Sequence, residues 1–197
     1  MNRIIAFFDF DGTITSKDTL LEFIKYVKGD ASFYFGFLLH CPILVLYKLN
    51  VISNQRAKEI MLNYFFGKMK SEEFSKYCED FMSEKLPGLL REKAMGEIRK
   101  MQDVGAEVVV VSASPENWLE AWCTANGVKC IATKLDTRND RITGRIDGLN
   151  CHGKEKVRRI NEAFNLSDYS SIYAYGDTPG DRHMLAIANY KFYKPFR

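Results

Sequence analysis

Three short apolar runs lie along the chain, and each one ends in a polar stretch. The runs are Ile4–Phe8, Val108–Val111 and Ile172–Tyr175, and the stretches that follow them read "DFDGT", "SASPENW" and "GDTPGD". Continuous β-branched or aromatic runs of this kind are typical of parallel strands that are covered on both faces. We therefore expect three buried strands whose polar ends meet at one edge of a sheet.

Helical patterns alternate with these runs. One covers Leu89–Met101 and stops at Gly105, a second covers Glu116–Ala125 and stops at Gly127, and a third follows Gly153. Strands that alternate with helices predict an α/β fold with a doubly wound parallel sheet. In such sheets the ligand site lies beyond the carboxyl ends of the strands, so the three polar stretches are expected to form one site.

Two segments depart from this alternation. Residues 16–87 contain helical patterns only, and the clearest of them, Ser71–Leu86, has apolar residues at helical spacing behind a Ser71 cap. We expect an all-helical cap domain inserted at residues 16–87, with a catalytic core made of residues 1–15 and 88–197. The second segment, "CIATKLDTRNDRITGRIDG", has two alternating stretches around Asn139 and Asp140, and this pattern predicts a β-hairpin.

The cap contains an unusual apolar stretch. Ala31–Tyr47 has no Asp, Glu, Lys or Arg. It is shorter than the roughly 20 residues that a transmembrane helix needs, and Pro42 would break it. Two interpretations remain open. The stretch forms a pair of buried cap helices that meet at Pro42, which is the more ordinary outcome, or it forms an apolar surface for a lipid-like substrate or for peripheral contact with a membrane.

The composition is that of an ordinary globular protein. Of 197 residues 46% are hydrophobic and 27% are charged, the net charge is +3, and the basic residues form no block that would favour nucleic acid. The five cysteines are widely spaced without a C-x-x-C pair, which argues against disulfides or a zinc site and suits a cytoplasmic protein. The first apolar run is too short for a signal peptide.

We expect structural roles for His40, His152 and His183, and turn roles for Thr13 and Thr178.

The pair Asp9 and Asp11 is the clearest chemical signal. An EF-hand loop also begins with D-x-D, but it follows a helix and has its glycine at position six, whereas Gly12 stands earlier and follows a strand. A turn that caps the next helix would explain one aspartate but not both. We therefore expect Asp9 to act as a nucleophile and Mg²⁺ ligand, with Asp11 as its acid/base partner.

Four stretches together resemble the motifs of the haloacid dehalogenase superfamily of phosphatases. "DFDGT" resembles motif I and "VVVVSAS" resembles motif II, with its serine at Ser112. Lys154 in "GKEKVRRI" resembles the lysine of motif III, and "YGDTPGD" resembles motif IV, with Asp177 and Asp181. The hairpin and the helical insertion after motif I are similar to the phosphoserine-phosphatase branch, subfamily IB.

The resemblance implies a Mg²⁺-dependent phosphomonoester phosphatase that acts through an aspartyl-phosphate on Asp9. It implies that the metal binds Asp9, the main-chain carbonyl of Asp11, and Asp177. Asp181 would orient Lys154 or hold a metal-bound water. The residues implied in phosphate binding are Gly12, Ser112, Ala113 and Lys154.

The substrate stays open because the chain departs from the phosphoserine-phosphatase pattern. In phosphoserine phosphatases motif IV resembles "GDGAND". In this chain Gly180 stands at the position of the Asn. Asp18 replaces a cap glutamate, and Arg56 is the candidate for the arginine that reads the substrate. A phosphorylated small molecule, phosphoserine itself and a phosphatidylglycerophosphate-type lipid phosphate are alternatives. A phosphotransferase and a non-catalytic phosphate-binding protein are further alternatives.

Overall fold

A parallel sheet forms the centre of the computed structural model, which describes residues 3–49 and 51–197. The strand order is β3-β2-β1-β6-β7, and all neighbouring pairs run parallel. The strands are β1 (Ile4–Phe8), β2 (Glu107–Pro115), β3 (Lys129–Thr133), β6 (Ser171–Gly176) and β7 (Tyr190–Tyr193). The three predicted strands are confirmed as the centre of the sheet, and β3 and β7 extend it at the two edges.

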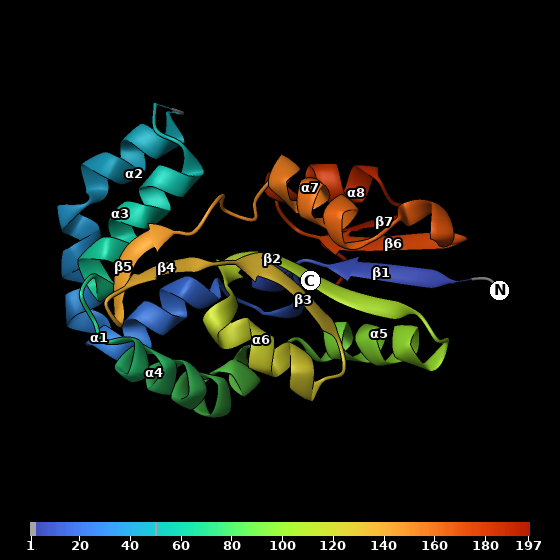
Figure 1. Ribbon diagram of the computed structural model, residues 1–197, viewed down its shortest axis with the longest axis horizontal. Coiled ribbons are helices and arrows are strands. Elements are labelled where there is room, and N and C mark those ends of the chain that lie inside the picture. The colour runs from blue at the N-terminus through green and yellow to red at the C-terminus, as the bar shows by residue number, and fades with distance from the viewer. Residues whose placement is uncertain (1–2, 50) are drawn as a thin grey trace.

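Helices cover both faces of this sheet (Figure 1). On one face lie α5 (Glu92–Asp103) and α6 (Glu116–Ala125), and on the other lie α7 (Lys154–Ala163) and the short α8 (Arg182–Ala186). Successive side chains of a strand point to opposite faces. Accordingly Phe8 is buried in the apolar core on one side of β1 and Phe7 in the core on the other side. The predicted doubly wound α/β fold is therefore confirmed.

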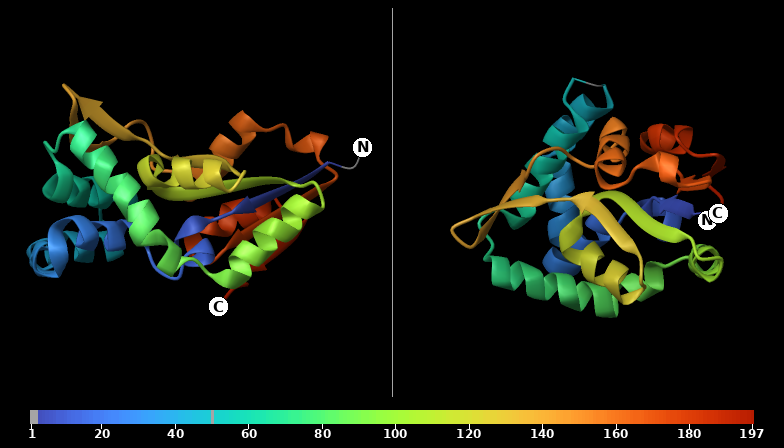
Figure 2. Two further views of the ribbon diagram at one scale, coloured as in Figure 1. Left: turned by 90° about the horizontal axis from the view of Figure 1, so that it is seen from below. Right: turned by 45° about the vertical axis from the view of Figure 1, so that its right-hand side comes forward.

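The cap helices lie beyond the carboxyl ends of the strands (Figure 2). They are α1 (Thr19–Leu39), α2 (Cys41–Lys48), α3 (Asn54–Phe66) and α4 (Ser71–Glu84). Short helical turns cover Phe10–Ile14, Leu86–Leu89, Leu166–Asp168 and Pro179–Asp181. Within α1 the chain kinks at Gly29, whose φ of 77° is outside the helical range. The α1 segment after this kink and α2 form the outermost part of the cap.

The predicted hairpin is present and packs with the cap helices. It consists of β4 (Leu135–Arg138) and β5 (Arg141–Ile146). Its turn has positive φ at Asn139 (48°) and Asp140 (56°), as the sequence indicated. The side-chain amide of Asn63 in α3 donates a hydrogen bond of 2.8 Å to the carbonyl of Thr143. A segment far along the chain thus supports the inserted helices.

An aromatic cluster joins the cap to the sheet. The ring of Phe23 in α1 lies 4.7 Å from that of Trp118 in α6, measured between centroids. It also lies 5.3 to 5.4 Å from the rings of Phe66, Phe74 and Phe81 in α3 and α4. All five side chains are buried in one continuous core. The cap is therefore anchored by packing of aromatic rings as well as by its chain connections.

Two local expectations need correction. Ser71 is the first residue of α4 and Lys70 takes the cap position, so the predicted Ser71 cap is wrong. The hydroxyl of Ser71 is buried without a hydrogen-bond partner among the described residues. The apolar stretch does form two helices that meet beside Pro42, but α2 contains no buried residue among those described. Of the two interpretations left open, burial therefore applies to Phe33 and Gly36 of α1 and not to α2.

The length and composition of the helices bear on membranes. In the part of the chain that the structure describes, no single helix is both long and apolar enough to cross a membrane. Helices α1 and α2 reach that composition only when they are taken together, and they are bent by 59° at the break between them.

Candidate active site

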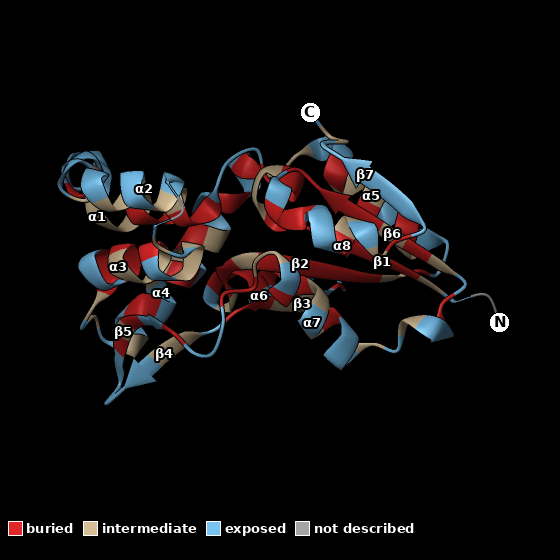
Figure 3. Ribbon diagram, turned by 90° about the horizontal axis from the view of Figure 1, so that it is seen from above, coloured by how far each residue is buried: buried red, intermediate tan, exposed pale blue. Residues whose placement is uncertain are grey.

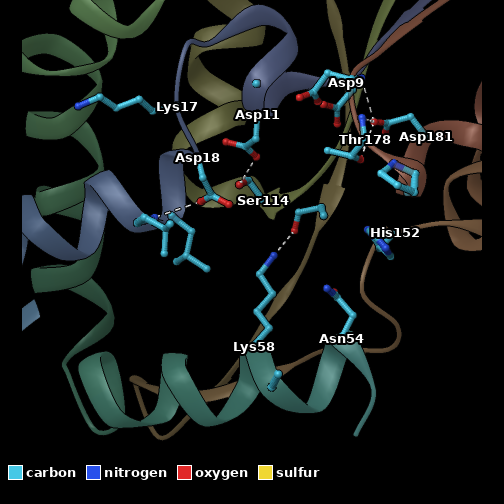
Figure 4. A pocket seen from close by; sticks show the side chains of 18 of the residues that line it. Asp9, Asp11, Lys17, Asp18, Asn54, Lys58, Ser114, His152, Thr178 and Asp181 are labelled. Atoms are coloured by element: carbon cyan, nitrogen blue, oxygen red, sulfur yellow. Dashed lines mark hydrogen bonds between the residues drawn. The ribbon is translucent and has the colours of Figure 1, made fainter. Parts of the chain in front are cut away.

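Three buried carboxylates meet at the carboxyl edge of the sheet. Asp9 follows β1, Asp177 follows β6, and Asp181 lies in the turn after Asp177. One carboxylate oxygen from each lies within 4.8 Å of the others. Figure 4 shows Asp9 and Asp181 facing each other from these two segments. Asp9 and Asp177 are close together because β1 and β6 are neighbouring strands. At their ends the backbone amide of Asp9 donates to the carbonyl of Tyr175 at 2.9 Å.

Gly12 permits this close approach. Its φ is +79°, which residues with a Cβ rarely adopt. A Cβ built at this position would lie 2.5 Å from Oδ2 of Asp177. The chain can therefore turn after Asp11 and still pass against Asp177 only with glycine at this position.

Lys156 supplies the cation of the cluster. Its Nζ lies 2.5 Å from Oδ1 of Asp9 and 2.7 Å from Oδ1 of Asp181, and the side chain is buried. The motif resemblance implied Lys154 in this role, but Lys154 is exposed at the first residue of α7. Positions two apart on a helix point in widely different directions, so only one of the two lysines can face the sheet. The lysine that contacts the carboxylates is therefore Lys156, in place of the expected Lys154.

The pKa values of this cluster are interdependent. Burial disfavours the charged ammonium of Lys156, but the carboxylates of Asp9 and Asp181 outweigh this effect and raise its pKa. Burial raises the pKa of Asp9, and the Lys156 charge opposes that rise. Burial also acts to raise the pKa of Asp181, but Lys156 and Thr178 bring it below the usual value. Lys156 therefore remains charged and holds the carboxylates together.

Thr13 connects two of the carboxylates. Its hydroxyl lies 3.1 Å from Oδ2 of Asp9 and 3.3 Å from Oδ1 of Asp177. This residue was expected only as a turn residue. Thr178 has the expected turn role, because its side chain and that of Asp181 form a reciprocal capping pair.

The side chain of Asp11 is fixed by hydroxyl and amide donors. Its Oδ1 accepts from the backbone amide of Thr19 at 2.7 Å and from the Thr19 hydroxyl at 2.6 Å. Its Oδ2 accepts from the hydroxyl of Ser114 at 2.6 Å and from that of Ser112 at 3.4 Å. Ser114, which the sequence analysis missed, lines the cavity described below. It lies two residues beyond Ser112 along β2, a spacing that places side chains on one face of a strand.

A cavity of about 670 Å³ lies between this cluster and the cap. The core contributes Asp9, Asp11, Gly12, Ala113, Lys156, Asp177 and Asp181 to its lining. The cap contributes an apolar wall that consists of Leu20, Leu21, Ile24, Phe37, Leu44 and Met61. The core side of the cavity is therefore charged, and the cap side combines this hydrocarbon with the polar residues Ser16, Lys17, Asp18, Asn54 and Lys58.

Lys58 is the basic residue that α3 contributes to this cavity (Figure 4). Its Nζ lies 2.5 Å from the carbonyl oxygen of Ala113 and 3.5 Å from Oδ1 of Asn150. Loss of solvation lowers the pKa of Lys58, and the nearby charges of Asp11 and Asp18 oppose this effect. Lys58 was not expected in the site, because its position on α3 carried no signal of its own in the sequence.

Arg56, the expected substrate-reading residue, lies elsewhere on α3. Its side chain is exposed and approaches Glu59 at 3.9 Å, and it is not among the residues that line the cavity. Asp18 does line the cavity, and its carboxylate caps α1 by accepting from the amide of Leu21 at 3.1 Å. Of the two specificity candidates, the structure brings Asp18 to the site and leaves Arg56 outside it.

His152 explains the glycine at position 180. A Cβ at Gly180 would lie 2.3 Å from Cε1 of the His152 ring, so the ring occupies the space that a side chain at position 180 would need. His152 is half-buried and lines the cavity, and burial lowers its pKa. It was expected as a structural residue, and its place beside the cavity had no sequence signal apart from its position before Gly153.

The donor set fits a hard divalent cation. Mg²⁺ prefers oxygen ligands, and carboxylates supply them. Asp9 and Asp177 are buried together, and Asp177 also forms an ion pair with the guanidinium of Arg197. The guanidinium of Arg197 therefore already balances the charge of Asp177, one of the carboxylates expected to bind metal. The structure agrees in donor chemistry with the metal site that the motifs implied.

Comparison with known proteins agrees with this geometry. The family model of haloacid dehalogenase-like hydrolases matches residues 6–186. A protein named CicA from Caulobacter vibrioides (strain NA1000 / CB15N) is 36% identical over 196 residues, which cover 98% of this chain and 87% of the relative.

Two solved structures share the fold. One is a protein from Bordetella pertussis Tohama I, described as having unknown function, with a TM-score of 0.83, 24% identity and coverage of 95% of this chain and 88% of that one. The other is a phospho-aspartyl intermediate analogue of phosphoserine phosphatase, with a TM-score of 0.65, 20% identity and coverage of 97% and 86%. The second likeness is consistent with the subfamily IB arrangement. From the match over most of its length, the chain belongs to the haloacid dehalogenase-like hydrolase family.

Proposed function

We propose that this protein is a Mg²⁺-dependent phosphatase of phosphomonoesters that acts through an aspartyl-phosphate on Asp9. The observation that carries the proposal is the placement of Asp9. It is buried at the end of the central strand, against Lys156, and it lines a cavity roofed by the cap. The likeness in fold to a phospho-aspartyl analogue of phosphoserine phosphatase supports this choice of reaction.

The first step divides the work between two aspartates. A carboxylate oxygen of Asp9 forms a bond to phosphorus, and the bond from phosphorus to the ester oxygen breaks. The electron pair goes to the leaving oxygen, which takes a proton from Asp11. The hydrogen bonds from Thr19 and Ser114 hold Asp11 in place. These bonds fix the orientation of the acid without contributing a charge of their own.

The second step regenerates Asp9. Asp11, now a carboxylate, takes a proton from water as the water oxygen attacks phosphorus. The bond from phosphorus to Asp9 breaks, and inorganic phosphate leaves. Lys156 is placed to hold negative charge on the phosphoryl oxygens in both steps, because it lies 2.5 Å from the nucleophile. Gly12 and the backbone at Ala113 are the remaining proposed phosphate contacts. Ser112 is fully buried and is not among the residues that line the cavity, so its proposed role is the hydrogen bond to Asp11.

The metal would be held by Asp9, the main-chain carbonyl of Asp11, and Asp177, with Asp181 in support through Lys156. Mg²⁺ bound there supplies positive charge that offsets the repulsion between the Asp9 carboxylate and a phosphate dianion.

The substrate that we propose is a phosphomonoester with an apolar alcohol portion. The cap wall opposite the carboxylates consists mainly of hydrocarbon, and Lys58 is the cation that α3 adds to it. Phosphoserine would have to place its amino and carboxylate groups against the few charged residues that the cap contributes, Lys17, Asp18 and Lys58.

The free thiols of all five cysteines support a location in the cytoplasm.

The test is phosphate release from p-nitrophenyl phosphate and from a panel of polar and apolar phosphomonoesters. Activity that requires Mg²⁺, is lost in EDTA and is inhibited by Ca²⁺ supports the proposal, because Ca²⁺ takes more ligands at longer distances. Asp177→Ala should raise the Mg²⁺ concentration needed for half-activity. Full activity in EDTA would contradict the metal assignment, and no release from any ester would contradict phosphatase activity.

A further inference from the structure

The outermost part of the cap exposes an unusual number of large apolar side chains. They belong to the end of α1, to α2 and to the residues just after it. We call this surface the cap tip and define it as Tyr34, Phe35, Leu38, Leu39, Val45, Leu46, Leu49 and Val51. Leu38 is 74% exposed and Phe35 63% exposed. Figure 3 shows the same region as largely exposed ribbon at one end of the molecule.

The cap tip is held to the rest of the cap along one side only. Phe33 and Gly36 are the residues of α1 after the kink that are buried, and a Cβ at Gly36 would lie 2.4 Å from the ring of Phe65. α1 therefore packs closely on α3 at this point while its other side faces outward. Contiguous apolar patches of this kind are uncommon on monomeric proteins and mark surfaces that bind a partner or a membrane.

The same two helices also line the active-site cavity. Phe37 lies between the exposed residues of α1, and Leu44 and Tyr47 lie between those of α2. Each helix thus presents apolar side chains to the cavity and to the outside. The cap tip and the cavity wall opposite Asp9 are therefore two sides of the same pair of helices.

The charges around the cap tip are consistent with a negatively charged lipid surface. From Ala31 to Leu49 the sequence contains no acidic residue, and Lys48 is its one lysine or arginine. Lys25 borders the patch, with its Nζ 4.8 Å from the ring centre of Phe33 and 6.0 Å from that of Tyr34, and it also pairs with Glu22 at 3.5 Å. Asp30 immediately precedes Ala31. Apolar side chains bordered by lysines are the pattern by which helices bind at the interface of anionic membranes.

We infer that the cap tip docks on an anionic lipid bilayer and inserts its apolar side chains at the level of the headgroups. The bend of 59° between α1 and α2 suits a shallow position in the plane of the interface. The substrate that such docking delivers is a lipid phosphomonoester, whose hydrocarbon follows the apolar wall while its phosphate reaches Asp9. This second statement rests on the proposed function, whereas docking itself needs no turnover.

Flotation with vesicles tests the docking. The protein is mixed with vesicles of phosphatidylcholine alone, or of phosphatidylcholine with phosphatidylglycerol. Wild-type protein should float with the anionic vesicles and bind the neutral ones more weakly. The variant with both Phe35→Ser and Leu38→Ser should lose about tenfold or more in vesicle affinity, since it removes two apolar side chains from the inserted surface.

A matched control replaces two exposed apolar residues of the core, Val104→Ser and Leu149→Ser. This variant should float like the wild type, and both variants should keep the wild-type melting temperature. Equal flotation of all three proteins, or no flotation of the wild type, would overturn the proposal. So would sedimentation showing a dimer that the Phe35→Ser, Leu38→Ser variant dissociates, because the cap tip would then be a subunit interface.

Activity separates this inference from the proposed function. The Phe35→Ser, Leu38→Ser variant should hydrolyse p-nitrophenyl phosphate like the wild type but phosphatidate in vesicles at least about fivefold more slowly. Loss of both activities with a lowered melting temperature would show that the cap tip is part of the cap core and would overturn docking. Flotation of a wild type that hydrolyses neither ester would leave docking in place and contradict the phosphatase.

Discussion

The carboxyl edge of the sheet and the cap tip invert the usual distribution of side chains in opposite ways. At the edge, the charged groups Asp9, Lys156 and Asp181 are buried, and they are held by short contacts with one another. At the tip, large apolar groups such as Leu38 are exposed. Burial of charge and exposure of hydrocarbon both cost stability, so each marks a place where the chain is fitted for something other than folding. The edge is suited to chemistry and the tip to recognition.

The largest effect is expected from removing the charge of the nucleophile. Asp9→Asn keeps the shape of the side chain but removes the carboxylate that attacks phosphorus, so turnover of p-nitrophenyl phosphate should fall by at least about 10³-fold. Asp11→Asn should also be severely impaired while it still binds metal and phosphate. A turnover of Asp9→Asn within about tenfold of the wild type would show that the chemistry is not centred at this edge.

A comparison of two neighbouring lysines tests the geometry of the edge. Lys156→Ala leaves Asp9 and Asp181 buried without their cation, so it should reduce turnover by about 10²-fold or more. It should also cost about 3 to 5 kcal/mol in the free energy of unfolding. Lys154→Ala should change neither, because Lys154 is exposed. Steady-state kinetics and urea unfolding of both variants make the comparison. The reverse order of effects would show that α7 sits in a different register.

Two phenylalanines on the same helix sharpen the contrast between buried and exposed apolar groups. Phe23→Ala empties the centre of the aromatic cluster, so it should reduce the free energy of unfolding by about 3 to 5 kcal/mol. Phe35→Ala, at the cap tip, should stay within about 0.5 kcal/mol of the wild type. Urea denaturation of both variants gives the two values. A large loss of stability in Phe35→Ala would mean that the tip is packed.

The smallest effect is expected at the boundary between the two regions. Lys58→Met keeps the aliphatic stem but removes the cation that α3 adds to the cavity, so KM for phosphomonoesters should rise about tenfold with a smaller change in kcat. Arg56→Met is the control on the exposed side of α3, and its KM should equal that of the wild type. Equal KM values for Lys58→Met and the wild type would remove Lys58 from the binding site.

Much of the fold follows from the sequence because its elements have clear periodicity. The predicted bounds of the helix Glu116–Ala125 match the structure, and Ile4–Phe8 is the central strand. Strand β7 was missed because all its residues are exposed, so it lacks the apolar run that marked the other strands. Strand β3 was included in the hairpin because an alternating pattern continues from it into β4.

The site was predictable where a strand end fixes the side chain and not where a helix does. Asp9 and Asp177 follow strands directly, so their position at the edge was clear. The choice between Lys154 and Lys156 depends on which face of α7 meets the sheet. A signal was present, since Lys156 lies four residues before the buried Ile160 and shares its face. Lys58 had no such signal, because its role depends on how α3 is placed over the sheet.

The most direct test of the central claim is to trap the phosphoryl group on Asp9. The Asp11→Asn variant, whose second step lacks its base, is mixed with p-nitrophenyl phosphate and Mg²⁺ and quenched in acid, and peptides are mapped by mass spectrometry. The account predicts one phosphoryl group on the peptide that contains Asp9, and none when Asp9→Asn is added to the same variant. A phosphoryl group on another residue, or one that persists after Asp9→Asn, would contradict it.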